Sequence, residues 1–398
     1  MPSHLEDRPG LLIRDPFQFS DAILIVPPAL VGVLQLFDGQ HTMLEMKEIL
    51  YRATNELESG AILTHLFETL SQAGFLDDDR FAEMREARRA EFRESPTRLP
   101  SHAGSAYPDT VPELKATMER YFSGAGAAAA LDGIMGIAAP HVSPEGGWES
   151  YRDAYRLIPP SSNDDRVFVV LGTSHYGTPE RFGLTRKPYV TPFGAARTET
   201  ALVDFLEQRA PGAVLMEDYC HAVEHSIEFQ VAFLQSVCGP DVRVLPILCG
   251  PYVRSIYQGG MPEDDEDVHR FIEALRELNA REGRRLFWVL GVDMAHLGAR
   301  YGDEYEARAG QGMMIEAESR DRARIDQINR ADSQAYWDLV QQNHDDLKWC
   351  GSAPFYTFLK AVPSARGELQ RYQQWNIDEA SVVSFAGMVF RSPDAERN

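Results

Sequence analysis

The chain has 398 residues, of which 44% are hydrophobic, and this composition is typical of a folded protein large enough for two domains. Its 60 acidic and 39 basic side chains give a formal net charge of -21, which repels a phosphate backbone and argues against nucleic acid as a partner. The polar start MPSHLEDRPG is unlike a secretory signal, and no apolar run approaches the ~18 residues of a membrane helix. We therefore expect a cytoplasmic protein with no membrane contact.

The N-terminal region, residues 17–94, has a self-contained helical pattern. PALVGVLQLFDG predicts a short helix, TMLEMKEILYRA a second one with Thr42 as N-cap and Glu45 three residues on, and GAILTHLFETLSQAGFL a third that ends at Gly74. The apolar FL before DDDR suggests a short β-wing, and a charged helix follows. Three helices with a small hairpin predict a winged-helix-like α+β domain over residues 1–95.

The segment SPTRLPSHAGSAYPDT, residues 95–110, is rich in Ser, Pro and Gly, and we place the domain boundary there. A second domain over residues 100–398 alternates short apolar runs with segments of helical period. The expected strands are 134–140, 166–172, 242–248, 285–291 and 382–390, and the expected helices are 146–158, 200–210, 226–237 and 267–283. Strands that are apolar on both faces and separated by helices predict an α/β domain with a mostly parallel central sheet flanked by helices.

Polar residues with chemical potential follow three of the expected strands. His141 follows the first strand, His175 the second, and Asp293 and His296 the run RLFWVLG. Because ligand sites of open α/β sheets lie outside the carboxyl ends of the strands, we expect these side chains to share one site. A single histidine after a strand is more often a packing residue, but three histidines in equivalent places favour a shared site.

Three further residues are candidates for the same site. His225 and Glu228 lie three apart at the start of a helix, where the acid has the alternative role of stabilising the helix N-terminus. Cys350 precedes Gly351 and a helix start, whose backbone N–H groups favour a thiolate, although a buried inert thiol is an equal alternative. The other cysteines, Cys220, Cys238 and Cys249, form no CxxC pair and are expected to be free thiols.

Two neutral histidines with one anionic ligand form a set that leaves coordination positions open for substrate and oxygen. If the anion is a thiolate, Cu(I) and Zn(II) become plausible beside Fe(II), and the residues alone do not choose the metal.

Six motifs, taken in order, resemble the Memo family, also named AmmeMemoRadiSam system protein B. They are AGSAYPDTVPEL (103–114), APH (139–141), GTSHYG (172–177), EHSIEFQVAFL (224–234), VDMAH (292–296) and CGSAPF (350–355). The resemblance covers about residues 100 to 395 and implies a fold similar to class III extradiol dioxygenases, which are non-haem iron enzymes that open aromatic rings.

The resemblance also implies roles for individual residues. It gives His141, His175 and Cys350 as metal ligands, with Fe(II) or Cu favoured over Zn, and His296 as an acid/base, while Asp293 orients either His296 or the ligands. We expect His225 and Glu228 to support the site by hydrogen bonds. HVSPEGGW replaces the small run that usually follows the first motif, and Thr173 stands where the family usually has Pro, so the substrate preference does not transfer.

The N-terminal region lies outside this pattern. LFDGQHTMLEMKEIL followed by LSQAGFLD resembles the small winged-helix peptide chaperones of pyrroloquinoline-quinone biosynthesis, and an unrelated helical appendage is the alternative. The resemblance implies a peptide-binding role.

Three functions follow as hypotheses. The first is a metal-dependent oxidoreductase that acts on a small aromatic or peptidyl substrate, with a radical S-adenosylmethionine protein as partner. The second is a peptide- or phosphopeptide-binding adaptor, which needs basic residues such as Arg181, Arg186 or Arg197 near the pocket. The third is a zinc hydrolase, although the chain has neither HExxH nor GxSxG. We favour the first, because an adaptor needs no acid/base pair beside a ligand set.

Overall fold

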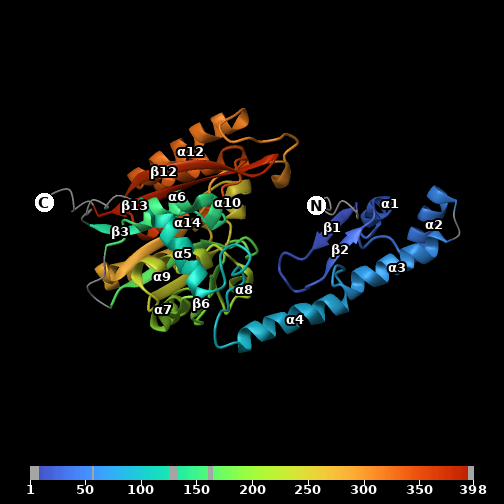
Figure 1. Cartoon of the computed structure of the whole chain (residues 1–398), viewed down its shortest axis with the longest axis horizontal. Coiled ribbons are helices and arrows are strands. Elements are labelled where there is room, and N and C mark those ends of the chain that lie inside the picture. The colour runs from blue at the N-terminus through green and yellow to red at the C-terminus, as the bar shows by residue number, and fades with distance from the viewer. Residues whose placement is uncertain (1–8, 56–57, 125–132, 160–164, 393–398) are drawn as a thin grey trace. The chain divides into compact units, whose positions relative to one another are not determined.

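A computed structural model describes residues 9–55, 58–124, 133–159 and 165–392 (Figure 1). The chain forms two compact units, Met1–Glu94 and Ser95–Asn398. Among the residues described, no helix is both long enough and apolar enough to cross a membrane.

The first unit begins with a β-hairpin and continues as helices. Strands β1 (Leu11–Arg14) and β2 (Ile23–Val26) pair antiparallel. The helices are α1 (Pro28–Val31), the 3-10 helix Gly32–Leu36, α2 (Met43–Thr54), α3 (Ser59–Gln72) and α4 (Asp79–Glu94). They enclose a small core of their own that includes Leu63, Leu66 and Leu70 from α3.

Thr42 caps α2 as expected, because its side chain accepts from the Glu45 backbone while the Glu45 carboxylate accepts from the Thr42 backbone. The β-wing expected at FLDDDR is wrong. Asp78 in that run accepts a hydrogen bond of 2.9 Å from the backbone of Phe81 and thereby begins α4. The hairpin lies before the helices instead, and the resemblance to a winged-helix chaperone stays a prediction.

The second unit is built on one large sheet. In the described chain its eleven strands follow the order β11-β13-β3-β10-β4-β9-β5-β8, with β12 beside β13, β7 beside β9 and β6 beside β7. The strands are β3 (Ile134–Ala139), β4 (Val167–Thr173), β5 (Phe182–Leu184), β6 (Tyr189–Thr191), β7 (Gly194–Thr198), β8 (Val214–Met216), β9 (Arg243–Cys249), β10 (Leu286–Gly291), β11 (His296–Gly298), β12 (Arg366–Asp378) and β13 (Ser381–Arg391). The five strands expected from the sequence are all present.

The centre of this sheet is parallel, because β3, β10, β4 and β9 run in the same direction. Antiparallel strands flank it, with β13 beside β3 and β5 beside β9. Successive residues of β4 alternate between two hydrophobic cores: Val169 and Leu171 belong to one, Phe168 and Val170 to the other. The sheet is therefore buried on both faces, which confirms the predicted α/β class.

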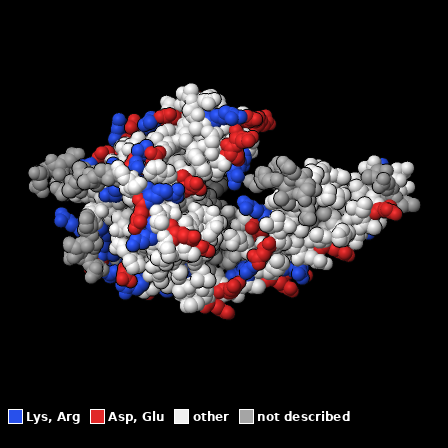
Figure 2. Space-filling view, viewed as in Figure 1, with Lys and Arg blue, Asp and Glu red and all other residues white. Residues whose placement is uncertain are grey.

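Helices provide the apolar side chains that cover the two faces. They are α5 (Val111–Phe122), α6 (Pro144–Tyr155), α7 (Thr200–Arg209), α8 (Cys220–Val223), α9 (Glu228–Cys238), α10 (Val253–Gln258), α11 (Glu266–Glu282), α12 (Met313–Arg330), α13 (Ser333–Gln341) and α14 (Ser352–Ala361). Helices α7, α11 and α14 contribute to one core, and α5, α6 and α9 to the other. Figure 2 shows acidic and basic side chains interspersed over the visible face of this unit.

Candidate metal centre

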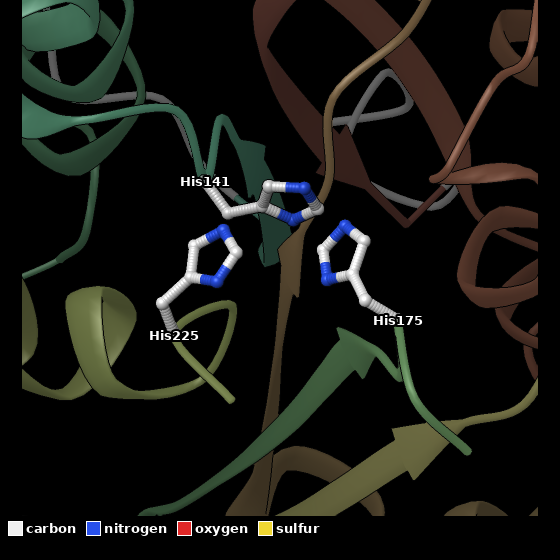
Figure 3. A group of neighbouring side chains, drawn as sticks. All are labelled: His141, His175 and His225. Atoms are coloured by element: carbon white, nitrogen blue, oxygen red, sulfur yellow. The ribbon is translucent and has the colours of Figure 1, made fainter. Parts of the chain in front are cut away.

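Three histidines meet at the carboxyl edge of the parallel strands. His141 lies two residues after β3, His175 two residues after β4, and His225 in the turn between α8 and α9. One ring nitrogen from each lies within 4.8 Å of the others, and the three rings face a common point (Figure 3). The structure therefore brings together the two strand-end histidines that were expected as ligands and His225, which was expected to support the site by hydrogen bonds rather than to bind the metal.

Two glycines allow the turn with His225 to lie close to the strand ends. A Cβ added to Gly172 in β4 would lie 2.6 Å from Ser226 Oγ, and one added to Gly291 in β10 would lie 2.2 Å from the Ser226 carbonyl oxygen. No side chain fits in such a space. The glycines that end both VLG runs thus bring the third histidine to the site.

The tautomer of His141 is fixed by the neighbouring strand. Its Nδ1 lies 2.9 Å from the Gly291 carbonyl oxygen, which can only accept a hydrogen bond. Nδ1 therefore carries the proton and Nε2 presents a lone pair. His141 is 2% exposed.

The Glu224 carboxylate orients the other two rings. Oε2 lies 3.0 Å from Nδ1 of His175, and Oε1 lies 3.1 Å from Nδ1 of His225. The carboxylate also accepts the backbone N–H groups of His175, His225 and Ser226 at 2.8 to 3.0 Å. Both rings thus donate through Nδ1, which leaves Nε2 as the nitrogen that can bind a metal ion, and this is the arrangement of histidine ligands backed by a carboxylate.

The charges in this group are coupled. Burial alone would raise the pKa of the Glu224 carboxyl, but the attraction of His175 and His225 and their hydrogen bonds hold that pKa well below its usual range. Burial opposes a charge on His175, yet Glu224 and Cys350 raise the pKa of this ring well above its usual value. Burial and the two neighbouring imidazoles keep the pKa of His141 well below its usual value. A bound cation would take the place of the proton on His175.

Cys350 and Asp293 adjoin His141. Cys350 Sγ lies 3.2 Å from His141 Nε2 and 3.6 Å from the Asp293 carbonyl oxygen. Burial raises the pKa of this thiol, and the nearby His175 opposes that shift in part. Asp293 Oδ1 accepts the His141 backbone N–H at 2.9 Å, so this carboxylate supports the histidine loop directly.

His296 is a neutral ring beside this group. Its Nδ1 donates to the Met294 carbonyl oxygen at 2.8 Å, and its ring centroid lies 5.0 Å from that of Tyr301. Burial lowers the pKa of His296 to about 4, although the Asp293 charge favours the protonated form. Near neutral pH the ring therefore has an unprotonated Nε2 that can accept a proton.

Glu228 lies behind the turn and has a different set of partners. Its carboxylate pairs with Arg98 and accepts the backbone N–H groups of Ser101 and His102, each at 3.0 Å, and the Tyr107 hydroxyl. Glu228 is fully buried. Its hydrogen bonds fix residues 98–107 onto α9 and reach none of the three histidines of the group.

A cavity of about 310 Å³ lies beside His175 and Cys350. Four aromatic side chains contribute to its wall: Tyr252, Tyr257, Trp337 and Trp349. Polar groups on the wall include Ser174, Ser352, His344 and Lys348. Its size and lining are typical of a small-molecule site.

Glu224 is the functional residue that the sequence analysis missed. It stands next to His225 in EHSIE, and the signal available was a carboxylate adjacent to a candidate ligand. Helical periodicity gave no further signal for Glu224, because α8, which ends just before it, has only four residues. Only the fold shows that the same carboxylate also reaches His175, which is 49 positions away.

Comparison with known proteins identifies the family of the second unit. The family model described as Memo-like protein matches residues 98–389. The chain belongs to this family. The match confirms the resemblance drawn from the six motifs, and it leaves the first unit outside.

Curated relatives agree with this assignment. A MEMO1 family protein of Aquifex aeolicus is 24% identical over 383 residues, with 95% of each chain covered. A MEMO1 family protein of Archaeoglobus fulgidus is 24% identical over 296 residues, which cover 74% of this chain and 99% of the relative. Another from Thermus thermophilus is 27% identical over 298 residues, covering 74% of this chain and 82% of the relative. The Aquifex match is long enough to include part of the first unit of this Memo-like protein.

Proposed function

We propose that this Memo-like protein is a metal-dependent oxidoreductase, with Fe(II) or Cu held by His141, His175 and His225. The observation that carries the proposal is the group of three ring nitrogens within 4.8 Å of one another, in which each ring has its Nδ1 bound to a protein oxygen and Nε2 available for a metal ion. Cys350 Sγ lies 3.2 Å from His141 Nε2 but is not part of this group, so His225 replaces Cys350 in the proposed ligand set, and the thiol adjoins it.

The donor set fits such an ion. Neutral imidazoles suit iron, copper and zinc, and a thiolate favours the softer copper. The Glu224 carboxylate adds a negative charge behind two of the rings, which offsets part of the charge of a cation. His175 is exposed, and the adjoining cavity gives a substrate access to the same point.

A bound iron or copper ion supplies electron transfer and activation of a coordinated substrate. The residues of this chain do the rest. Nε2 of His296 accepts a proton from the substrate, and the nearby Asp293 carboxylate stabilises the imidazolium that results. The aromatic walls of the cavity exclude water from one side of the reacting group and orient a flat ring.

These walls favour a small aromatic molecule or an aromatic peptide side chain as the substrate. The first unit, if it binds peptide as its resemblance implies, would present such a peptidyl substrate. A radical S-adenosylmethionine protein is the partner that the family's system name suggests.

A zinc hydrolase is the second candidate, because three histidine nitrogens with an open position also make a catalytic zinc site. The adaptor function has less support. Lys348 is the basic residue on the cavity wall, and its ammonium group already binds Asp303 at 2.6 Å. Arg181, Arg186 and Arg197 are not among the residues that line this cavity.

The test is metal analysis of the full chain purified without oxygen, for the wild type and for His141→Ala, His175→Ala, His225→Ala and Cys350→Ser. His269→Ala on the exposed side of α11 and Cys238→Ser are matched controls. We expect stoichiometric iron or copper in the wild type and the controls, loss in the three histidine variants, and weaker retention in Cys350→Ser. Oxygen-uptake assays with phenolic substrates follow.

Zinc as the bound metal would favour the hydrolase. A folded wild-type chain that takes up no iron, copper or zinc when each is offered would overturn the enzyme proposal and leave the adaptor.

A further inference from the structure

Arg98 is a fully buried arginine at the back of the turn that carries His225. Its Nε donates to the His221 carbonyl oxygen at 2.7 Å, and its Nη2 donates to the Glu224 carbonyl oxygen at 2.8 Å. Its Nη1 pairs with the Glu228 carboxylate. Nη2 also binds the Ser101 hydroxyl at 3.0 Å, and the guanidinium lies 5.0 Å from the ring centroid of Tyr189.

The two carbonyl groups belong to the end of α8. The last carbonyl groups of a helix have no partner within the helix, and a positive charge is favourable there. The planar guanidinium binds both carbonyl groups from one side while it neutralises Glu228 on the other. Arg98 thus fixes the end of α8 relative to the first residue of α9.

The contact with Glu224 acts on a single peptide group. The carbonyl oxygen of Glu224 accepts from Arg98, and the N–H of the same peptide, which belongs to His225, donates to Glu224 Oε1 at 2.8 Å. The orientation of this peptide plane determines where the Glu224 side chain and the His225 ring leave the backbone. The same carboxylate then holds the His175 ring.

We propose that Arg98 is a positioning residue of the metal centre, which acts through the peptide between Glu224 and His225. The inference rests on the proposed metal site. It means that the segment directly after Glu94, where the first unit ends, helps to position two metal ligands, His175 and His225. The Ser-, Pro- and Gly-rich composition of this segment predicted a domain boundary there, yet the segment carries Arg98, whose contacts reach the turn with His225.

Co(II) binding tests this role, because the metal alone is the probe and its visible spectrum reports the ligand geometry. Arg98→Lys keeps a positive charge next to Glu228 but lacks the fork that binds both carbonyl groups. We expect the Kd for Co(II) to rise about tenfold, at the lower end of the effect of residues that support metal ligands, with a shifted absorption band.

A second pair of variants covers the case in which Arg98→Lys does not fold. Glu228→Gln keeps both contacts of Arg98 with the carbonyl groups, and we expect its Kd to stay within about threefold of the wild type, well inside the effect of losing a supporting residue. Arg98→Met combined with Glu228→Gln removes both charges together, which buried ion pairs often tolerate, and it should show the about tenfold loss.

Leu278→Ala is the control for a loss of stability alone. Leu278 is a buried residue of α11 and belongs to a different hydrophobic core from the residues of α9. It should bind Co(II) as the wild type does. Folded Arg98 variants with the affinity and spectrum of the wild type would overturn the positioning role and leave the metal site intact. A wild-type chain that binds no Co(II) would overturn both.

Discussion

The turn between α8 and α9 separates two regions that contain similar residues in different arrangements. In the first, the fully buried Glu224 carboxylate faces His175 and His225, whose side chains are 27% and 28% exposed. In the second, the fully buried Glu228 carboxylate faces the guanidinium of Arg98, and both side chains are inaccessible. The two acids are only four positions apart in the chain.

The difference between the regions lies in the partner's chemistry. A neutral imidazole can bind a metal ion through Nε2 while its Nδ1 stays bound to a carboxylate, so the rings at Glu224 can hold a cation and stay in place. A guanidinium keeps its proton at every accessible pH, so the pair of Arg98 and Glu228 is permanent. The Glu224 carboxylate therefore belongs to a region that can take up and release a metal ion, which we call the exchangeable region. The Glu228 carboxylate belongs to a region that only fixes the chain, which we call the permanent region.

Glu228→Gln tests the permanent region and should have the largest effect. Removing one partner leaves the buried Arg98 charge uncompensated, so we expect the free energy of unfolding to fall by about 3–5 kcal/mol. Urea denaturation followed by tryptophan fluorescence measures it, since all five tryptophans lie in the second unit. A loss below about 1 kcal/mol, the worth of an exposed pair, would show that water reaches this region.

Acid titration of the metal-free wild-type protein should cause the same loss of unfolding free energy as Glu228→Gln, because acid protonates the Glu228 carboxylate. The pKa of Glu228 is lowered, with burial opposing and Arg98 favouring the charged form. A lowered pKa gives stability that is fully present above the unfolded value of about 4.3 and is lost as the pH falls through the folded value. The difference in unfolding free energy between the wild type and Glu228→Gln should therefore shrink below about pH 4.3. A constant difference would contradict the pairing.

Glu224→Gln tests the exchangeable region. The amide has one acceptor oxygen in place of two, so it cannot accept from both Nδ1 atoms, and one ring loses its orientation. We expect Co(II) affinity to fall about 10–100-fold. Calorimetric titration measures it, with Glu228→Gln as the matched control. Equal losses in the two variants would mean that the two regions act as one.

The sequence predicted the parts of this site that follow from the sheet. His141 and His175 each lie two residues beyond a buried strand, and parallel strands end at one edge, so their meeting was expected. The different roles of Glu224 and Glu228 were not expected, because both acids belong to one short motif. Their roles depend on which distant segment reaches them: the end of β4 for Glu224 and residues 98–107 for Glu228.

The fold, too, was predicted only where the sequence pattern is strong. The five buried strands were predicted because each is a short, mostly apolar run, and the parallel centre of the sheet follows from their alternation with helices. The hairpin of the first unit was missed because β1 and β2 have only four residues each, and the Pro residues after β2 interrupt the apolar pattern. The acidic run DDDR was assigned to a wing, whereas Asp78 is used to start α4.

Ser226→Ala should have the smallest effect and shows how the two regions are joined. Ser226 lies between the two acids, and its hydroxyl donates to the Thr173 carbonyl oxygen at 2.8 Å, which ties the turn to the end of β4. The loss of this bond should cost about 1 kcal/mol of unfolding free energy. Its backbone contact with Glu224 does not need the hydroxyl, so Co(II) affinity should fall less than in Glu224→Gln. Ser150→Ala in α6, which loses one partly buried bond to Gln373 in β12, is the matched control and should lose similar stability with unchanged affinity. If Ser226→Ala lowered the affinity as much as Glu224→Gln does, the tie to β4, rather than the carboxylate, would be what aligns the histidines.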